Sequence, residues 1–284
     1  MRALAAAALV YALVYAYLGL SGAFTAPLIL APIVLAYLLA RSWLAAAFVI
    51  LLPMYFFIGA ATAAWPHYRP ITILDGLMPL RPGWMTVYGS LYVCGFLLPL
   101  LVVRGEDLIG RTLKAYLTVM VISYAGFLVY PTVAPRQDVV VVTGFAEWTL
   151  QLFYDLDQPY GCFPSLHVAY SFVAAFACLQ MNRSVGMAAL VWSVLIGVST
   201  VYTKQHYVVD AVAGALIATV AWVVFLRTLR PHVVSETDRR AAVPRALSAA
   251  LAYVGAVAVF WIAFQFGLGP EHAVSAVAPS IRTF

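Results

Sequence analysis

Residues 201–218 read VYTKQHYVVDAVAGALIA, and they place Lys204, His206 and Asp210 at the start of a strongly apolar segment. An ionisable side chain in a lipid-embedded helix costs free energy, so each one marks a candidate functional position. His206 and Asp210 are four positions apart, and on a helix this spacing stacks two side chains on one face. The stretch therefore predicts a membrane helix that carries a polar site at one end.

The rest of the chain has the same apolar character. Of its 284 residues, 64% are hydrophobic and only 10% are charged. Apolar runs near the length that crosses a ~30 Å hydrocarbon core recur throughout. Because these runs are continuous and do not alternate with polar residues, they do not fit a β-barrel. We expect an all-α fold, a polytopic transmembrane helical bundle that forms one membrane domain over residues 1–284.

The apolar runs predict nine spans. They lie near 3–20, 26–40, 43–62, 85–103, 115–130, 166–181, 185–203, 207–227 and 247–267. The first resembles a signal peptide, but its long, tyrosine-rich apolar run favours a retained span.

The basic residues predict the orientation of the bundle. Eleven of the sixteen Lys and Arg residues fall on the side that holds the N-terminus, and five fall on the other. Cytoplasmic loops are enriched in Lys and Arg. We therefore expect the loops 131–165 and 203–207 to face the periplasm or a lumen. The net charge of +5 does not indicate a nucleic-acid partner.

Three polar pieces of sequence meet on the outward side. They are YPTVAPR at 130–136, GCFPSLH at 161–167 and STVYTKQHYVVD at 199–210. Residues 145–154 precede the second piece and form either a short interfacial helix or a simple connector. The nearby carboxylates of Asp155 and Asp157 are expected to be solvated, although they could also bind a polyol headgroup.

The third piece supplies a candidate nucleophile. Asp210 can accept a hydrogen bond from one imidazole nitrogen of His206, which leaves the other nitrogen as a directed lone pair. The alternative is that Asp210 only satisfies a buried His206.

The other two pieces supply groups that can bind and protonate a phosphate ester. Ser165 can cap the following helix, whose free N–H groups favour an anion, and His167 lies in its first turn. Arg136 offers a bidentate grip on phosphate, and Lys204 offers a point charge. Catalysis of phosphoryl transfer consists mostly of positioning and charge stabilisation. These residue types therefore indicate phosphoryl transfer through a phosphohistidine.

These motifs resemble the type 2 phosphatidic acid phosphatase superfamily. The family pattern is Lys-x6-Arg-Pro, then Pro-Ser-Gly-His, then Ser-Arg-x5-His-x3-Asp. Here the second motif reads Pro164-Ser165-Leu166-His167, and the third reads Ser199-Thr200-x5-His206-x3-Asp210. The resemblance covers roughly residues 85–227 and implies a six-helix phosphatase-type core. Extra spans then lie within 1–62 and 247–267.

The resemblance also implies a role for each matching residue. His206 would accept the phosphoryl group and Asp210 would orient it. His167 would protonate the leaving alkoxide, and Ser165 with nearby backbone N–H groups would bind phosphate oxygens. The implied partners are a phospholipid or lipid phosphate and the membrane. No cofactor and no metal ion is expected, because cationic side chains supply the charge.

The chain departs from the family pattern at three places. Thr200 replaces an Arg, Leu166 replaces a Gly, and the first motif keeps only Arg136 without its Lys. Lys204, one helical turn beyond Thr200, would supply the missing charge if that segment stays helical. These features are most similar to the branch that includes inositol phosphorylceramide synthases, which move a phosphoryl headgroup from one lipid to another alcohol.

The sequence leaves three other readings open. A lipid phosphate or isoprenyl-diphosphate phosphatase would use the same motifs, and an inactive family member would keep only part of them. A lipid transporter would spread polar residues through mid-span positions, whereas here the ionisable residues gather at one rim. Cys94, Cys178 and the small pair Gly214 and Ala218 are expected to be packing residues.

Overall fold

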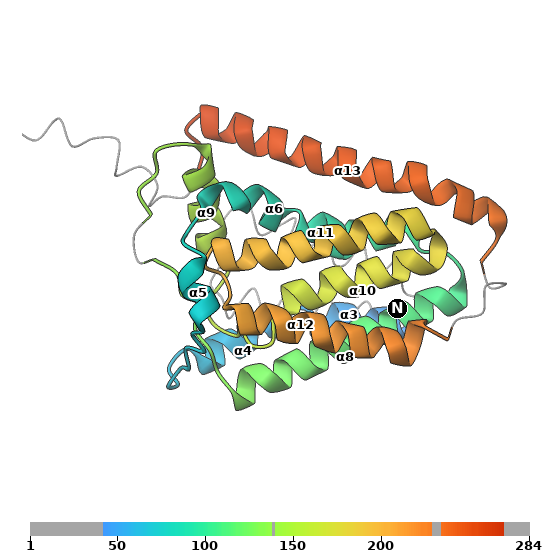
Figure 1. Ribbon diagram of the computed structural model, residues 1–284, viewed down its shortest axis with the longest axis horizontal. Helices are drawn as coiled ribbons and strands as arrows, with labels where there is room; N and C mark the ends of the chain where they lie inside the picture. The colour runs from blue at the N-terminus through green and yellow to red at the C-terminus, as the bar shows by residue number, and fades with distance from the viewer. Residues whose placement is uncertain (1–41, 138–139, 229–233, 270–284) are drawn as a thin grey trace, which may run out of the picture.

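The structure is a computed structural model that describes residues 42–137, 140–228 and 234–269 (Figure 1). These residues form helices and contain no strand. Six segments are long and apolar enough to span a membrane: Trp43–Thr62, Pro82–Val102, Glu106–Val129, Arg183–Tyr202, Val208–Leu226 and Glu236–Gln265. A shorter apolar helix covers Leu166–Met181. The predicted all-α bundle is confirmed, and the predicted spans 3–20 and 26–40 lie outside the described residues.

The helices follow one another in this order along the chain. The first half contains α3 (Trp43–Leu51), α4 (Met54–Thr62), α5 (Ile73–Leu77), the 3₁₀ turn η1 (Pro82–Trp84), α6 (Met85–Gly89), the π-helical turn η2 (Val93–Leu97), α7 (Leu98–Val102) and α8 (Glu106–Val129). The second half contains α9 (Phe145–Leu156), α10 (Leu166–Met181), α11 (Arg183–Tyr202), α12 (Val208–Ala221), the π-helical turn η3 (Trp222–Leu226) and α13 (Glu236–Gln265).

Prolines interrupt two of the predicted spans. Pro99 has no N–H to give to the carbonyl of Gly95, so the helix widens into the π turn η2. The Tyr116 hydroxyl donates to the freed Gly95 carbonyl. Similarly, Pro53 separates α3 from α4, and the Tyr124 hydroxyl lies 3.0 Å from the carbonyl oxygen of Leu51. Polar side chains of α8 thus satisfy backbone groups that would otherwise lie unpaired inside the bundle.

Two helices begin earlier than predicted because charged residues stabilise their first turns. Helix α8 begins at Glu106 rather than at 115, and Asp107 pairs with Arg111 at 2.9 Å. Acidic residues at a helix N-terminus interact favourably with the helix dipole. Helix α13 begins at Glu236 rather than at 247, where the Ser235 side chain caps the helix. Hydropathy alone predicts that a helix begins where its apolar run begins, and it misses a polar first turn.

Helix α10 lies in the middle of the bundle, between α11 and α12 (Figure 1). Small side chains line much of it, and Ala174, Ala175 and Cys178 are fully buried. Gly214 of α12 meets the start of α10, where an added Cβ would lie 2.3 Å from the Ser165 carbonyl oxygen. The expectation that Gly214 is a packing residue is confirmed, and this contact fixes the N-terminus of α10 against that of α12.

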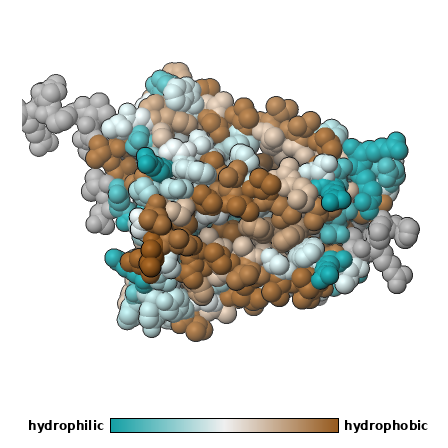
Figure 2. Space-filling model, in the orientation of Figure 1, coloured by the Kyte–Doolittle hydropathy of each residue, from teal (hydrophilic) through white to brown (hydrophobic). Residues whose placement is uncertain are grey.

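The surface fits a protein that spans a membrane. Figure 2 shows hydrophobic residues over much of the visible flank, with hydrophilic residues gathered toward the ends of the long axis. Helix α13 runs along one edge of the bundle and exposes large apolar side chains, among them Leu247, Leu251, Val254 and Val259. Since such side chains are costly in water, lipid is their natural surrounding. The protein is an integral, multi-pass membrane protein.

Candidate functional site

The three polar pieces of the sequence meet at one end of the bundle. We call this end the rim and define it as residues 63–81, 130–137, 157–167 and 203–207. The N–H of Ser165 donates to the carbonyl of Asp210 at 3.0 Å, which ties the second piece to the third. The Thr132 hydroxyl accepts from the N–H of Cys162 at 3.0 Å, which ties the first piece to the second. Segments far apart in sequence therefore form one site.

His206 and Asp210 lie together, but not on one helix as the spacing predicted. Helix α12 begins at Val208, so His206 precedes it. A tight turn brings His206 back, because its N–H and that of Gln205 both donate to the Thr200 carbonyl. Nδ1 of His206 then lies 3.5 Å from Oδ2 of Asp210. This oxygen also accepts from the Tyr207 N–H at 2.9 Å, so the carboxylate both caps α12 and faces the imidazole.

His167 faces the opposite edge of His206. Its Nδ1 lies 3.2 Å from Nε2 of His206, and the two rings are nearly perpendicular at 74°. Its position is set by the cap of α10, in which Ser165 Oγ accepts from the Val168 N–H at 3.3 Å. The Tyr88 hydroxyl of α6 lies 3.3 Å from the same Nδ1. The two predicted histidines are thus in direct contact, next to a tyrosine that the sequence motifs did not indicate.

Arg136 is also at the site, and its side chain is fully engaged. Nε donates to Oε1 of Gln205 at 3.0 Å, and Nη1 donates to the carbonyls of Tyr154 and Asp157 at 3.0 and 2.8 Å. Nη2 donates to the Gln158 carbonyl at 3.3 Å and also to Gln205 Oε1. All five guanidinium N–H groups therefore have an acceptor. Arg136 joins the loop after α8 to the end of α9 and to the loop before α12.

Lys204 is engaged by a backbone carbonyl of the rim loop 63–81. Helix α11 ends at Tyr202, and Lys204 has the left-handed φ of 56°, which costs a non-glycine residue about 1 kcal/mol. Its ammonium donates to the Met78 carbonyl at 2.6 Å. Because α11 ends two residues beyond Thr200, the full helical turn from Thr200 to Lys204, on which the predicted phosphate contact depended, does not form. Thr200 itself is fully buried, and its hydroxyl donates to the Gly197 carbonyl.

Asp157 is a site residue that the sequence analysis missed. It was expected to be solvated, yet it is only 8% exposed. Oδ1 accepts from the Tyr55 hydroxyl at 2.7 Å, and Oδ2 lies 3.9 Å from Nε2 of His167. Asp155, in contrast, is exposed and accepts from Gln151. Helical spacing could have revealed that Asp157 is buried. It lies four and eight positions after Phe153 and Thr149, which form the buried face of α9.

The rim loop 63–81 holds the connection between α11 and α12 in place. The Asp75 carboxylate accepts from the N–H of Val208, the first residue of α12, at 2.8 Å. The Arg81 N–H donates to the Tyr202 carbonyl at 2.9 Å, in the last turn of α11.

Residues 145–154, for which the sequence left a short helix or a connector open, belong to helix α9. This helix extends to Leu156 and crosses the same end of the bundle (Figure 1).

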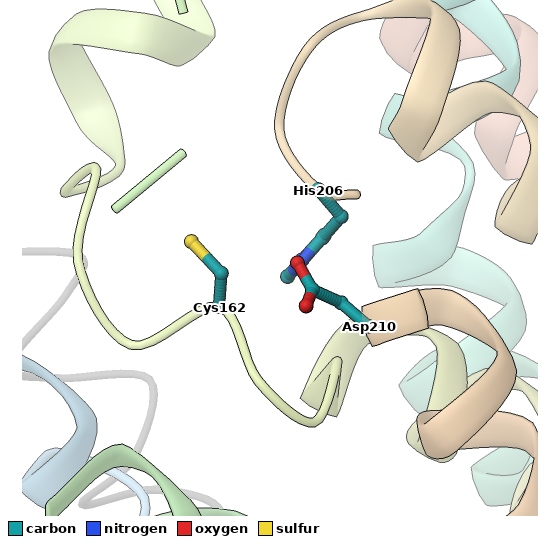
Figure 3. A group of neighbouring side chains, drawn as sticks. All are labelled: Cys162, His206 and Asp210. Atoms are coloured by element: carbon teal, nitrogen blue, oxygen red, sulfur yellow. The ribbon is translucent and has the colours of Figure 1, made fainter. Parts of the chain in front are cut away.

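Cys162, His206 and Asp210 are the described residues that could hold a metal ion (Figure 3). Their ligand atoms all lie within 4.8 Å of one another. Zinc bonds of 2.0–2.3 Å place ligand atoms roughly 3.3–3.8 Å apart, so the group would have to contract by about 1 Å. Burial also raises the pKa of the Cys162 thiol well above its ordinary value, and a thiol must lose its proton to bind a metal.

A comparison with known protein families matches residues 78–224 to the PAP2 superfamily. No curated protein and no solved structure matches the chain. The matched segment runs from the loop before η1 to η3, and it includes His167, His206 and Asp210. Because the match covers more than half of the chain, the protein belongs to the PAP2 superfamily of membrane phosphatases and phosphotransferases.

Proposed function

We propose that the protein transfers a phosphoryl group from a phospholipid to an alcohol through a phosphohistidine at His206. Family membership and the apolar helices support a membrane phosphatase or phosphotransferase. One observation carries the mechanism. Nε2 of His206 faces His167 at 3.2 Å, while Nδ1 of the same ring faces the Asp210 carboxylate at 3.5 Å. Once the two rings separate, one edge of His206 can attack phosphorus while the other faces a carboxylate.

The reaction has two steps. In the first, Nε2 of His206 bonds to phosphorus, the bond from phosphorus to the lipid alkoxide breaks, and His167 gives the alkoxide a proton. In the second, the acceptor hydroxyl gives a proton to His167 and its oxygen bonds to phosphorus, which releases His206. Asp210 stabilises the positive charge that develops on His206 during the attack.

The phosphoryl group needs space between the two histidines. Because their nitrogens are 3.2 Å apart, substrate binding must separate the rings. His206 is the ring that can move, since it lies in the connection before α12, whereas His167 is part of α10. We infer that rotation of the His206 side chain admits the substrate, because the rim loop 63–81 holds the backbone of this connection in place.

The phosphate oxygens then need positive charge. We propose that Arg136 turns its Nε and Nη2 edge from the Gln205 side-chain oxygen to the phosphate, because one acceptor there can replace another. Ser165 would contribute through the N-terminus of α10. Lys204 would have to leave the Met78 carbonyl before it could take part.

An apolar pocket next to the site supports a lipid substrate. It has a volume of about 300 Å³ and lies between α6, α9 and α13. Phe153 lines it and packs edge-on against Tyr88 with ring centroids 5.7 Å apart, and Tyr88 contacts His167. Ligand pockets are typically apolar, with a few polar groups that fix the reactive end. An acyl chain in this pocket would hold the phosphate ester close to the histidines.

We propose that the active site faces the periplasm or a lumen. The rim lies at the opposite end of the helices from the basic residues Arg111 and Arg183, near the starts of α8 and α11, and basic residues favour the cytoplasmic side. The similarity to the branch of inositol phosphorylceramide synthases supports transfer to an inositol-type or long-chain alcohol. With water as the acceptor, the same site would act as a lipid phosphatase.

Labelled phospholipids in nanodiscs test this function. Wild type, His206→Ala and His167→Ala are incubated with and without inositol or a long-chain alcohol. We expect a new phospholipid only when an acceptor is present, and its loss in both variants. His67→Ala is the control, because the ring of this rim histidine stacks on Tyr160 and not on His167 or His206. Equal product from the wild type and His206→Ala would refute the proposal.

A further inference from the structure

The general acid of the proposed reaction also has a carboxylate behind it. We propose that Asp157 is a positioning residue for His167, so that the site contains a second His–Asp pair that mirrors His206 and Asp210. This inference rests on the proposed function, because it assigns a task within the same reaction. Neither the sequence motifs nor the family resemblance points to Asp157.

The two His–Asp pairs have matching geometry on either side of the place where the phosphate would react. The inner edges of the rings face each other, with His206 Nε2 and His167 Nδ1 3.2 Å apart. Each outer edge faces an aspartate. Asp210 lies 3.5 Å from Nδ1 of His206, and Asp157 lies 3.9 Å from Nε2 of His167. An in-line displacement needs the nucleophile on one side of phosphorus and the proton donor on the other, and this arrangement supplies both.

The Asp157 carboxylate is buried, and the N–H groups of Arg136 donate to other acceptors. Its hydrogen bonds come from two tyrosine hydroxyls, Tyr55 at 2.7 Å and Tyr88 at 3.4 Å. The guanidinium of Arg136 lies 3.8 Å from Oδ2, but its N–H groups donate to backbone carbonyls and to Gln205. One of its oxygens therefore remains directed at His167.

A negative charge behind His167 has two effects on its imidazole. At 3.9 Å from Nε2, its charge favours a proton on that nitrogen over Nδ1, and it stabilises the doubly protonated ring. The other charged or titratable groups that face this ring are His206, Arg136 and Tyr88. Burial of the ring, above all, and the positive charges of His206 and Arg136 oppose protonation of His167, and Asp157 is the group whose charge favours it.

The proton then follows a balanced course. Protonated His167 gives its Nδ1 proton to the leaving alkoxide as the phosphorus–oxygen bond breaks, and it keeps the proton on Nε2. The neutral ring presents the Nδ1 lone pair to the acceptor hydroxyl and takes up its proton in the second step. Asp157 holds the same tautomer through both steps and gains no proton itself.

Asp157→Asn tests the inference by the choice of leaving group. A general acid contributes roughly 10²–10⁴-fold with a poor leaving group and little with a good one. We expect Asp157→Asn to lower kcat/KM, which reports the first step alone, by about 10–100-fold on a phospholipid and by less than about threefold on p-nitrophenyl phosphate. His167→Ala should show the same selectivity. His206→Ala should lose both activities, because it removes the nucleophile.

A pH profile gives an independent readout. The carboxylate stabilises charged His167, so its removal should shift the basic limb of the kcat profile on phospholipid to lower pH. A purely structural residue would lower kcat without moving this limb. The control is Asp155→Asn, which removes an exposed carboxylate two positions earlier and should leave both readouts unchanged.

Tyr55→Phe is a second variant, which tests the role of Asp157 if Asp157→Asn does not fold. It removes one hydrogen bond to the carboxylate and should cause a smaller loss with the same leaving-group selectivity. Equal losses on both substrates with an unmoved pH limb, or no loss at all, would overturn the role of Asp157. A wild type as inactive as His206→Ala on every substrate would instead overturn the proposed function, and the role of Asp157 with it.

Discussion

Replacing Asp210 with Asn separates the catalytic role of this carboxylate from its structural role. Asn keeps the shape of the side chain, and its oxygen can still accept from the Tyr207 N–H, now at 2.9 Å. The helix cap of α12 should therefore survive. What disappears is the negative charge 3.5 Å from Nδ1 of His206.

The size of the effect follows from Coulomb's law. Two unit charges at this separation attract by about 5 kcal/mol at an effective dielectric constant of about 20. This attraction is gained as His206 becomes positive during the attack on phosphorus. Since 1.36 kcal/mol corresponds to a tenfold change in rate, we expect kcat to fall by about 10³-fold. The loss of favourable charge at the N-terminus of α12 should cost only about 0.3–1 kcal/mol of stability.

The assay compares phosphoryl transfer in nanodiscs with thermal unfolding of the same preparations. Asp75→Asn is the matched control, because Asp75 also accepts an N–H from the start of α12, at 2.8 Å, but faces no histidine. It should lose some stability and keep its kcat. If Asp210→Asn kept more than about a tenth of the activity, or if both variants lost activity equally, the charge on Asp210 would not have the proposed role.

Four further predictions concern packing, the lipid pocket, the buried thiol and metal dependence. Gly214→Ala places a Cβ 2.3 Å from a backbone oxygen of α10, so it should lower unfolding stability by about 1–3 kcal/mol; Gly255→Ala, which has open space, should not. Ala256→Phe fills the apolar pocket and should raise KM for long-chain lipids several-fold, whereas Ala258→Phe on the same helix should leave KM unchanged. Because burial raises its pKa, Cys162 should resist alkylation at pH 8 until the protein unfolds, and rapid labelling of the folded protein would contradict this. EDTA should leave the transfer rate unchanged, since cationic side chains supply the charge, and a loss restored by added zinc would show that a metal is required.

The sequence predicted the fold well because the membrane imposes a simple rule. Apolar runs long enough to cross the hydrocarbon core have to form helices, and every span predicted within the described residues contains helix. The details that hydropathy missed have local causes. Charged side chains extend α8 and α13 beyond their apolar runs, and Pro53 and Pro99 interrupt two other spans.

The candidate site was predictable where short motifs specify it. The motifs brought forward His167, His206, Asp210 and Arg136, and the structure places all four at one end of the bundle. Motif spacing could not show that a turn, and not a helix, carries His206. That outcome depends on hydrogen bonds to the Thr200 carbonyl.

Two residues at the rim have surroundings that the sequence did not predict, for a related reason. The ammonium of Lys204 contacts the Met78 carbonyl, which lies far away in sequence, and its contact with a phosphate stays a prediction. Asp157 was expected in solvent and is buried between tyrosines of α4 and α6. The surroundings of a loop side chain are set by tertiary contacts, and these contacts leave little trace in local sequence.

The most direct test of the account is to trap the covalent intermediate. Wild type and the His206→Ala and His167→Ala variants are mixed rapidly with a phospholipid labelled with ³²P, quenched at alkaline pH to preserve phosphohistidine, digested and analysed by mass spectrometry. We expect the labelled phosphoryl group on the peptide that contains His206, bonded to Nε2 of its ring. The corresponding peptide of His206→Ala should carry no label. Label on another residue, or turnover by the wild type with no labelled histidine at any time, would contradict the account.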